Sequence, residues 1–253
     1  VAFVVAGAGV KVAKHGNRAI SGSSGSADVL EKLGVKITLS PYSVKKCIEN
    51  IGIGFIFAQS FHPAMKFASP LRREIGIPTV FNLLGPLTNP AGASNQLIGI
   101  SNYEAAEKVA EALKILGTKN SLVVNGHNNL DEISIEGNTT IWQVSENKVK
   151  RRKTRISDFG LPESSISNLI IGSVSESADT IKRVFSGEGS DSLDTSNIAS
   201  RRNAVLINTA AALVATGKAE SFNNATEMAK TSIDSGSAQS KLLELIDASN
   251  KMD

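Results

Sequence analysis

The chain has 253 residues, of which 41% are hydrophobic and 20% charged, and its formal net charge is +3. These values are ordinary for a soluble globular protein that forms one domain, or one domain and a lobe. The small positive charge suits an anionic small substrate and is too weak to indicate nucleic-acid binding by itself. No apolar run approaches the roughly 20 residues of a membrane-spanning helix, so we expect no membrane partner.

The chain starts with Val1, and the apolar segment Val1–Val10 is typical of the later turns of a buried helix with no cap before it. We therefore expect the chain to be a fragment. The single cysteine, Cys47, excludes an intrachain disulfide and fits a reducing cytoplasm, where we expect the protein to act. Cys47 lies in a helical pattern and is predicted to be a small core or half-buried residue.

Residues 10–34 predict a short apolar strand, a polar loop with three glycines and four serines, and a helix that ends at Gly34. Glycines let backbone N–H groups approach a ligand, and a helix start favours negative charge. Lys14 and Arg18 flank the loop and add positive charge. The segment predicts an anion site, although the same residue types also occur in solvated strand-to-helix turns.

Strands and helices are predicted to alternate through the next part of the chain. We expect strands at 35–39 and 53–58, a helix at 42–50, a helix at 63–76 interrupted by Pro70, and a segment 79–84 leading into a rigid turn at 85–90. A strand at 96–100, an amphipathic helix at 103–116 and a strand at 121–124 follow. Residues 139–144 and 147–156 are expected to pair as antiparallel strands.

From residue 157 the pattern is mostly helical, with helices predicted at 175–185, 201–216, 221–235 and 237–250, the first of them capped by Ser175. Strands that alternate with helices indicate an α/β fold. We expect a central, mainly parallel sheet with helices on both faces.

Three further features have both a chemical and a plain structural interpretation. Asp131 and Glu132 follow a strand in a loop, where adjacent carboxylates can hold a hard cation or simply face solvent. Arg72 can bind a planar carboxylate through its guanidinium or lie on a solvated helix face, and His62 precedes a proline, a common place for a structural histidine. The basic run Lys148–Arg155 is typical of a solvated edge strand, with a nucleic-acid patch as the alternative.

The segment K-H-G-N-R-A-x-S-x-x-S-G-S-A-D-V-L-E-x-L-G at 14–34 resembles the phosphoribosyl diphosphate loop of the anthranilate phosphoribosyltransferases. The motifs H-P-A-M-K at 62–66, G-P-L-T-N-P at 85–90 and the Asp131–Glu132 pair are similar to those of the same family, and the resemblance spans essentially the whole chain. It implies a catalytic domain over residues 1–253, incomplete at its N-terminus, with a fold like that of the nucleoside phosphorylases.

The resemblance implies transfer of the phosphoribosyl group of 5-phosphoribosyl diphosphate to anthranilate, the second step of tryptophan biosynthesis from chorismate. It implies Mg²⁺ on Asp131 and Glu132, and contacts of anthranilate with Asn17, His62 and Arg72. No general acid or base is assigned. Residues expected along the phosphoribosyl diphosphate are Lys14, His15, Gly16, Asn17, Arg18, Ser21, Gly22 and Ser26.

The chain departs from the family pattern in two ways. A helical N-terminal lobe, a G-T-G-G-D loop and an N-x-S-T segment are absent before Val1, so we expect the chain itself to be impaired or inactive, and its parent to be a homodimer through that lobe. Asn129 stands where family members often have glycine, and we expect it to adopt the left-handed backbone of that turn.

Two other functions stay open on the sequence. A relative of the pyrimidine-nucleoside phosphorylases would share the fold and use phosphate to cleave a nucleoside. A non-enzymatic homologue would bind nucleic acid through Lys148–Arg155, which a sequence pI of about 8.9 favours.

Overall fold

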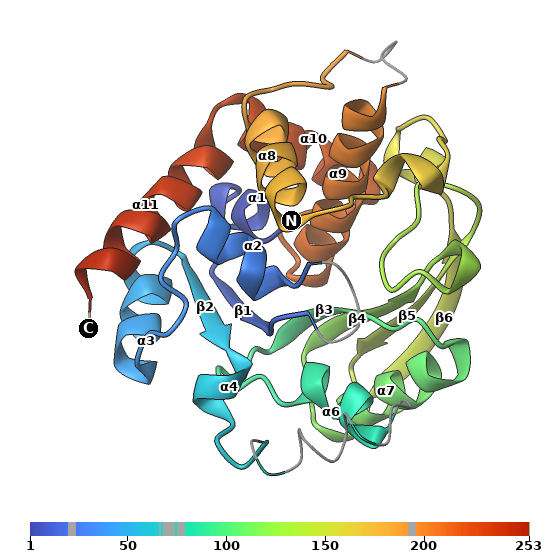
Figure 1. Ribbon diagram of the computed structural model, residues 1–253. Coiled ribbons are helices and arrows are strands. Elements are labelled where there is room, and N and C mark those ends of the chain that lie inside the picture. The colour runs from blue at the N-terminus through green and yellow to red at the C-terminus, as the bar shows by residue number, and fades with distance from the viewer. Residues whose placement is uncertain (20–23, 66, 68–73, 75–78, 192–195, 253) are drawn as a thin grey trace.

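The computed structural model describes residues 1–19, 24–65, 67, 74, 79–191 and 196–252. Its strands form two sheets (Figure 1). In the first sheet, β1 (Val12–Gly16) and β2 (Ile53–Phe57) run parallel, with Val12 opposite Ile53. All five residues of β2 are buried, as its continuous apolar run predicts for a strand covered on both faces.

The second sheet has the order β3-β4-β5-β6 and mixes the two kinds of pairing. Its strands are β3 (Asn95–Gly99), β4 (Asn120–Asn125), β5 (Thr139–Ser145) and β6 (Lys148–Thr154). β3 and β4 are parallel, whereas β4–β5 and β5–β6 are antiparallel. Glu146 and Asn147 both have positive φ angles between β5 and β6, the conformation that a tight hairpin turn requires.

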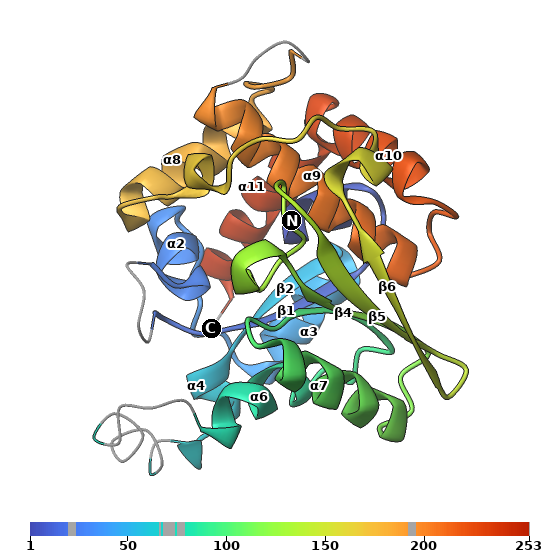
Figure 2. The ribbon, with the colours of Figure 1, turned by 90° about the vertical axis from the view of Figure 1, so that its right-hand side faces the viewer.

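Helices cover both faces of the second sheet (Figure 2). Helix α7 (Tyr103–Ile115) packs on one face through Val109 and Leu113, against Val123 and Trp142. Helices α9 (Asn197–Ala215) and α10 (Phe222–Asp234) belong to the apolar cluster on the other face. The remaining helices are α1 (Ala2–Gly7), α2 (Ser26–Lys32), α3 (Pro41–Asn50), α4 (Ala58–Phe61), α6 (Val80–Leu87), α8 (Val174–Phe185) and α11 (Ser237–Lys251), with short 3-10 turns η1 (His127–Asn129), η2 (Ile156–Phe159) and η3 (Ile166–Leu169).

The structure confirms the α/β class, the helices on both faces, the 139–156 hairpin and a buried Cys47. The sheet itself differs from the expectation, because the strands divide between two sheets and half of the four strand pairings are antiparallel. One antiparallel pairing is the β5–β6 hairpin. The other arises because the chain reverses direction between β4 and β5.

Three local predictions were wrong. Residues 35–39 are extended and alternate in burial, but they form no ladder, and the backbone N–H of Lys36 donates instead to Ser249 Oγ of α11 at 3.1 Å. Helix α6 continues through Gly85 and Pro86 to Leu87, so the rigid turn begins only at Thr88. Helix α8 is capped by Ser173, whose side chain accepts a hydrogen bond from the backbone N–H of Glu176.

The basic run lies on β6 at the edge of the second sheet, as expected, and most of its residues are exposed. Arg151 donates to the Tyr103 hydroxyl at 3.0 Å, and the Arg152 guanidinium lies 4.6 Å from the centre of the Phe222 ring. Among the helices of the described residues, none combines the length and apolar character that crossing a bilayer requires.

The burial of a side chain predicts how much its truncation lowers the free energy of unfolding. Ile141 of β5 is 0% exposed, whereas Ile115 at the end of α7 is 82% exposed. We expect Ile141→Ala to lower the free energy of unfolding by about 2–5 kcal/mol through lost burial and a cavity, and Ile115→Ala to change it by less than about 0.5 kcal/mol. Urea unfolding followed by circular dichroism measures both, and equal effects of the two variants would contradict this placement of the core.

Candidate functional site

The loop after β1 turns back on itself, and two glycines make this possible. A Cβ atom at Gly16 would lie 2.5 Å from Ser26 Oγ and 2.8 Å from the Phe55 ring. A Cβ atom at Gly25 would lie 2.2 Å from the backbone nitrogen of Ala19. The two sides of the loop therefore approach too closely for any larger residue, which explains the glycines without reference to a ligand.

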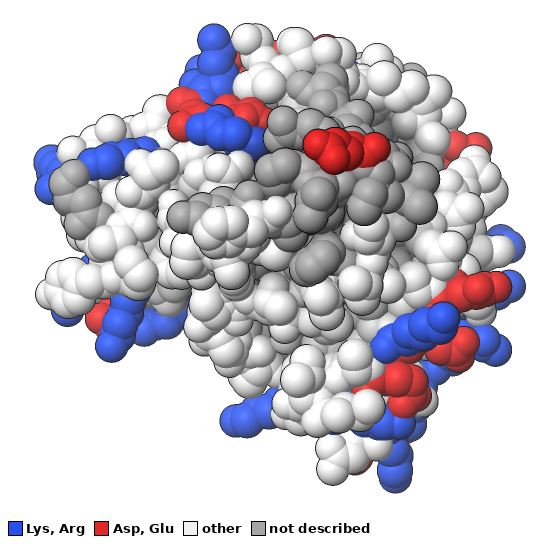
Figure 3. Space-filling view, turned by 60° about the horizontal axis from the view of Figure 1, so that its bottom comes forward, with Lys and Arg blue, Asp and Glu red and all other residues white. Residues whose placement is uncertain are grey.

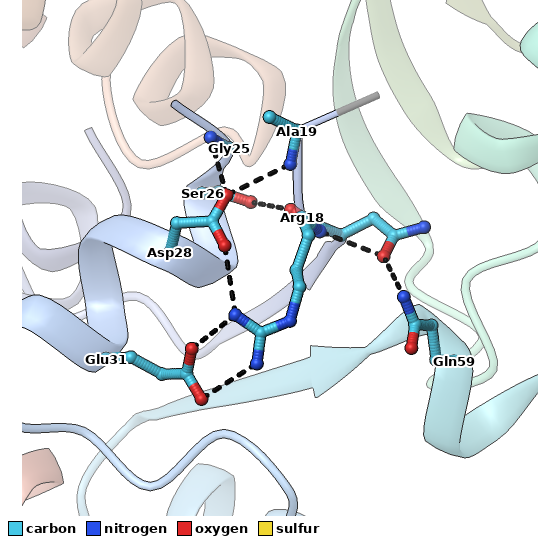
Figure 4. Close-up of polar contacts among 8 residues, drawn as sticks. Arg18, Ala19, Gly25, Ser26, Asp28, Glu31 and Gln59 are labelled. Atoms are coloured by element: carbon cyan, nitrogen blue, oxygen red, sulfur yellow. Dashed lines mark hydrogen bonds and ion pairs between the residues drawn. The ribbon is translucent and has the colours of Figure 1, made fainter. Parts of the chain in front are cut away.

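Asp28 of α2 closes this loop (Figure 4). Its Oδ2 accepts hydrogen bonds from the backbone N–H groups of Ala19 and Gly25, each at 3.0 Å. These bonds, led by that from Ala19, and the neighbouring Arg18 guanidinium lower the pKa of Asp28. The helix start that the sequence predicts as an anion site thus already holds an anion of the chain itself.

Arg18 is also engaged within the chain (Figure 4). Its guanidinium donates to Asp28 at 3.0 Å and binds both carboxylate oxygens of Glu31, one of them at 2.9 Å. Hydrogen bonds to Glu31 and then Asp28 raise the pKa of Arg18. The sequence predicted that Arg18 faces a phosphate, but in the structure its charge is balanced by two carboxylates.

Lys14 lies close enough to Glu132 for their charges to interact. Its side chain, on β1, reaches solvent, yet surrounding protein lowers its pKa by desolvation, while the charge of Glu132 acts in the opposite direction. The Val1 end of α1 faces the same two charges. The structure therefore brings the 14–26 loop and the 131–132 pair, more than a hundred residues apart in sequence, within electrostatic reach of each other.

The carboxylates of Asp131 and Glu132 both reach solvent from the loop after β4. Desolvation and then the like charge of Asp131 raise the pKa of Glu132, with the Val1 amine and Lys14 acting in the opposite direction. Asn128 and Asn129 in this loop have φ angles of +54° and +59°. The expectation that Asn129 adopts the left-handed backbone is confirmed.

Two histidines connect the remaining motifs. His15 at the end of β1 and His62 after α4 face each other with 3.2 Å between their Nε2 atoms. His15 also forms a hydrogen bond to the Gly85 backbone, and Asn89 donates to the carbonyl of Ala13 in β1 at 3.0 Å. The 14–34, 62–66 and 85–90 motifs therefore meet around the carboxyl end of β1.

Some predicted residues lie outside the part of the chain that the structure describes. They are Ser21, Gly22, Lys66 and Arg72. Asn17 and Ser26 are described and lie together, since Ser26 Oγ donates to the Asn17 carbonyl at 3.5 Å. Gln59 of α4, which the sequence analysis missed, donates to Asn17 Oδ1 at 3.4 Å (Figure 4).

A second residue that the sequence analysis missed is Asn208 of α9, whose side chain holds the backbone of Ile133, next to Glu132. One signal in the sequence marks it, because an asparagine interrupts the apolar run of this helix. Asn side chains are poorly suited to helix interiors unless their donors and acceptor find partners.

The carboxylate pair is compatible with Mg²⁺ on the chemistry of its donors. Among the described residues, no group of three or more His, Cys, Asp and Glu side chains converges as a complete metal cage. Two carboxylates are nevertheless what Mg²⁺ commonly takes from a protein when waters and substrate phosphates complete its shell. The raised pKa of Glu132 also indicates that its charged form is disfavoured, so a positive charge nearby would stabilise it.

Comparison with known proteins identifies the family. Residues 1–239 match the sequence model described as "Glycosyl transferase family, a/b domain". An anthranilate phosphoribosyltransferase of Herpetosiphon aurantiacus is 50% identical over 250 residues, which cover 98% of this chain and 72% of that protein. The chain belongs to the anthranilate phosphoribosyltransferase family. It is therefore an enzyme of the pentosyltransferase class, which sets aside the non-enzymatic alternative.

Solved structures of the family have the same fold. The anthranilate phosphoribosyltransferase of Thermus thermophilus superimposes with a TM-score of 0.89 at 38% identity, over 98% of this chain and 71% of that one. The Saccharomyces cerevisiae enzyme in complex with PRPP and Mg gives a TM-score of 0.88 at 32% identity, over 99% and 69% of the two chains. A second structure of the yeast enzyme, at 31% identity and with a TM-score of 0.85, is a complex with 4-fluoroanthranilate.

The distribution of charged side chains on one face of the molecule can be compared with that of nucleic-acid-binding proteins. On the face shown in Figure 3, basic side chains lie in separate groups, several of them beside acidic side chains. This arrangement differs from the continuous basic stripe that typifies nucleic-acid interfaces.

The histidine pair predicts a pH dependence of stability. Burial and then the neighbouring His62 lower the pKa of His15 below its usual 6.5. As pH falls below about 6.5, the unfolded chain therefore binds a proton at His15 more readily than the folded one, and stability decreases. Above that pH both states hold His15 neutral and the effect vanishes.

Urea unfolding between pH 5 and pH 7.5 measures this slope. We expect His15→Gln to flatten it relative to the unchanged protein, and His127→Gln, which alters the histidine outside the pair, to preserve it. A slope that is the same in all three proteins would contradict the role given to His15.

Proposed function

We propose that the chain transfers the phosphoribosyl group of 5-phosphoribosyl diphosphate to anthranilate, giving N-(5-phosphoribosyl)anthranilate and diphosphate. This is the second step of tryptophan biosynthesis from chorismate. The names of the relatives and the yeast complexes with PRPP, Mg and 4-fluoroanthranilate support it. The observation that carries it is the electrostatic proximity of Lys14 and Glu132, which joins a cationic loop to a carboxylate pair.

The reaction is a displacement at the anomeric carbon. The anthranilate nitrogen bonds to C1 of the ribose as the bond from C1 to the diphosphate oxygen breaks, with inversion, and the amine proton passes to solvent. Charge develops on the ring and on the leaving group, so the protein acts mainly by positioning and by electrostatic stabilisation. The weak basicity of an aromatic amine makes a strong protein base unnecessary, and we assign none.

The diphosphate is placed between Lys14 and the carboxylate pair. Lys14 offers a cation that surrounding protein partly desolvates, although solvent still reaches its side chain. Partial desolvation strengthens the attraction of a cation for an anion. Asp131 and Glu132 would hold Mg²⁺, which, when bound, offsets the negative charge of the departing diphosphate. His15, Gly16 and the residues expected from 21 to 26 complete this side of the site.

Arg18 takes a different role in this proposal. Because Asp28 and Glu31 neutralise its guanidinium, Arg18 orders the loop instead of contacting the diphosphate directly. The loop thus depends on an internal ion-pair network for its shape. The positive charge that this loop presents to the substrate comes mainly from Lys14.

Anthranilate is placed on the side of the histidine pair. The side-chain oxygen of Asn17 accepts hydrogen bonds from Gln59 and from the backbone N–H of Arg18, whereas its amide nitrogen donates to no other described residue. That nitrogen is thus a donor that a carboxylate can accept from. His62 and Arg72 belong to the same proposal on the resemblance of the 62–72 segment.

Further parts of the proposal concern the whole protein. We assign residues 1–253 to one catalytic domain and the reaction to the cytoplasm, with which a single, buried cysteine, Cys47, is compatible. Dimerisation through a helical lobe stays a prediction.

The carboxylate pair gives the test. We expect Asp131→Asn with Glu132→Gln to lower the rate of anthranilate consumption by about 100-fold or more, since removing a single electrostatic group from a transition state commonly has such an effect. The loss of anthranilate fluorescence with PRPP and Mg²⁺ measures the rate, on the chain and on the full-length gene product. Glu107→Gln, an exposed carboxylate of α7, is the matched control and should retain the rate.

Two outcomes would contradict the proposal. One is a folded full-length product that consumes no anthranilate. The other is phosphate-dependent release of thymine from thymidine, which would favour the pyrimidine-nucleoside phosphorylase alternative.

A further inference from the structure

We propose that Asn208 of α9 is a positioning residue for the metal-binding carboxylates, acting through the backbone of Ile133. This inference rests on the proposed function, since it assumes that Asp131 and Glu132 hold Mg²⁺. Asn208 comes from a helix more than seventy residues later in the chain. It contributes no ligand of its own.

Asn208 holds the Ile133 backbone from both sides. Its Oδ1 accepts a hydrogen bond from the Ile133 N–H at 2.9 Å, and its Nδ2 donates to the Ile133 carbonyl at 3.2 Å. The second Nδ2 hydrogen goes to the Ala204 carbonyl, one helical turn earlier, at 2.9 Å. Both hydrogens of the amide nitrogen and one lone pair of the amide oxygen are thus used, and only 4% of Asn208 is exposed.

These bonds cannot pass to water when Asn208 is removed. Ile133 is 1% exposed, and the neighbouring Ser134 is 0% exposed. A buried backbone group without a partner is costly, so the loop must shift to satisfy it. Any shift of Ile133 moves Glu132, its direct neighbour, and Asp131 one residue further on.

The other side of the carboxylate loop is fixed by close backbone packing. A Cβ atom at Gly99, the end of β3, would lie 1.6 Å from the carbonyl oxygen of Asp131. One at Gly126 would lie 2.4 Å from the carbonyl oxygen of Glu132. The two carboxylate residues are therefore backed by glycines on one side and followed at once by the backbone that Asn208 holds.

The arrangement has a consequence for metal affinity. Two adjacent carboxylates in one short loop repel each other. A loop that is free to relax would turn the two groups apart. Asn208 thus positions the metal ligands without binding the metal itself. The loss of residues with this role in other proteins typically lowers metal affinity 10- to 100-fold.

The experiment measures Mn²⁺ binding to the chain by electron paramagnetic resonance, with Mn²⁺ standing in for Mg²⁺. We expect Asn208→Ala to raise the Kd for Mn²⁺ by about tenfold or more. Asn208→Ser, which keeps a hydroxyl near the Ile133 backbone, should have a smaller effect. It also provides a second variant should the alanine variant not fold.

Ser232→Ala is the matched control. Ser232 is buried in α10 and donates to the carbonyl of Val4 at 2.8 Å, so its removal also breaks a buried bond from a side chain to the backbone. It lowers stability without touching the carboxylate loop. Its Kd for Mn²⁺ should equal that of the unchanged chain.

The double variant Asp131→Asn with Glu132→Gln separates the two claims. If it binds Mn²⁺ as well as the unchanged chain, the assignment of metal to these carboxylates is wrong. If it loses binding while both Asn208 variants bind like Ser232→Ala, the carboxylates hold the metal and the role of Asn208 is refuted.

Discussion

The site depends on holding two adjacent carboxylates within electrostatic reach of a lysine. Asp131 and Glu132 repel each other, and the surrounding protein also desolvates Glu132, so their placement costs free energy that the fold must supply. Lys14 offsets some of this repulsion and is itself destabilised as a cation by the same surroundings. Neighbouring groups of opposite charge whose pKa values are both shifted by desolvation are typical of sites that bind charged substrates.

The arrangement of strands explains why these groups meet. β1 delivers Lys14 and His15 at its carboxyl end, and the loop after β4 delivers the carboxylates, so the site lies where two sheets come together. Glycines at the contacts let one backbone approach another: Gly16 and Gly25 in the first loop, Gly99 and Gly126 around the second. These four glycines are therefore explained by packing of the protein against itself, before any ligand is considered.

Much of the fold could be predicted from the sequence, where periodicity was strong. The buried strand at 53–57, the amphipathic helix at 103–115 and the hairpin at 139–154 follow directly from local pattern. Residues 35–39 show the limit of this reasoning, because alternation of burial predicts an extended chain but not the partner of its backbone. Here that partner is Ser249, more than two hundred residues away.

The candidate site was predictable in its residue types and less so in its connections. The motifs indicated the residue types of the candidate site, yet nothing local indicated that Arg18 is neutralised by Asp28 and Glu31 or that Asn208 holds Ile133. Such partners lie on other elements, and only the tertiary fold brings them together. The single local signal was an asparagine in an otherwise apolar helix.

A crystal structure of the protein with PRPP and Mg²⁺ tests the central claim most directly. The account predicts a metal ion at about 2.0–2.1 Å from carboxylate oxygens of Asp131 or Glu132, with the diphosphate between that ion and Lys14. It also predicts that Arg18 still binds Asp28 and Glu31. A diphosphate that binds away from Lys14 and the carboxylate pair would contradict this account, as would a metal that binds without either carboxylate.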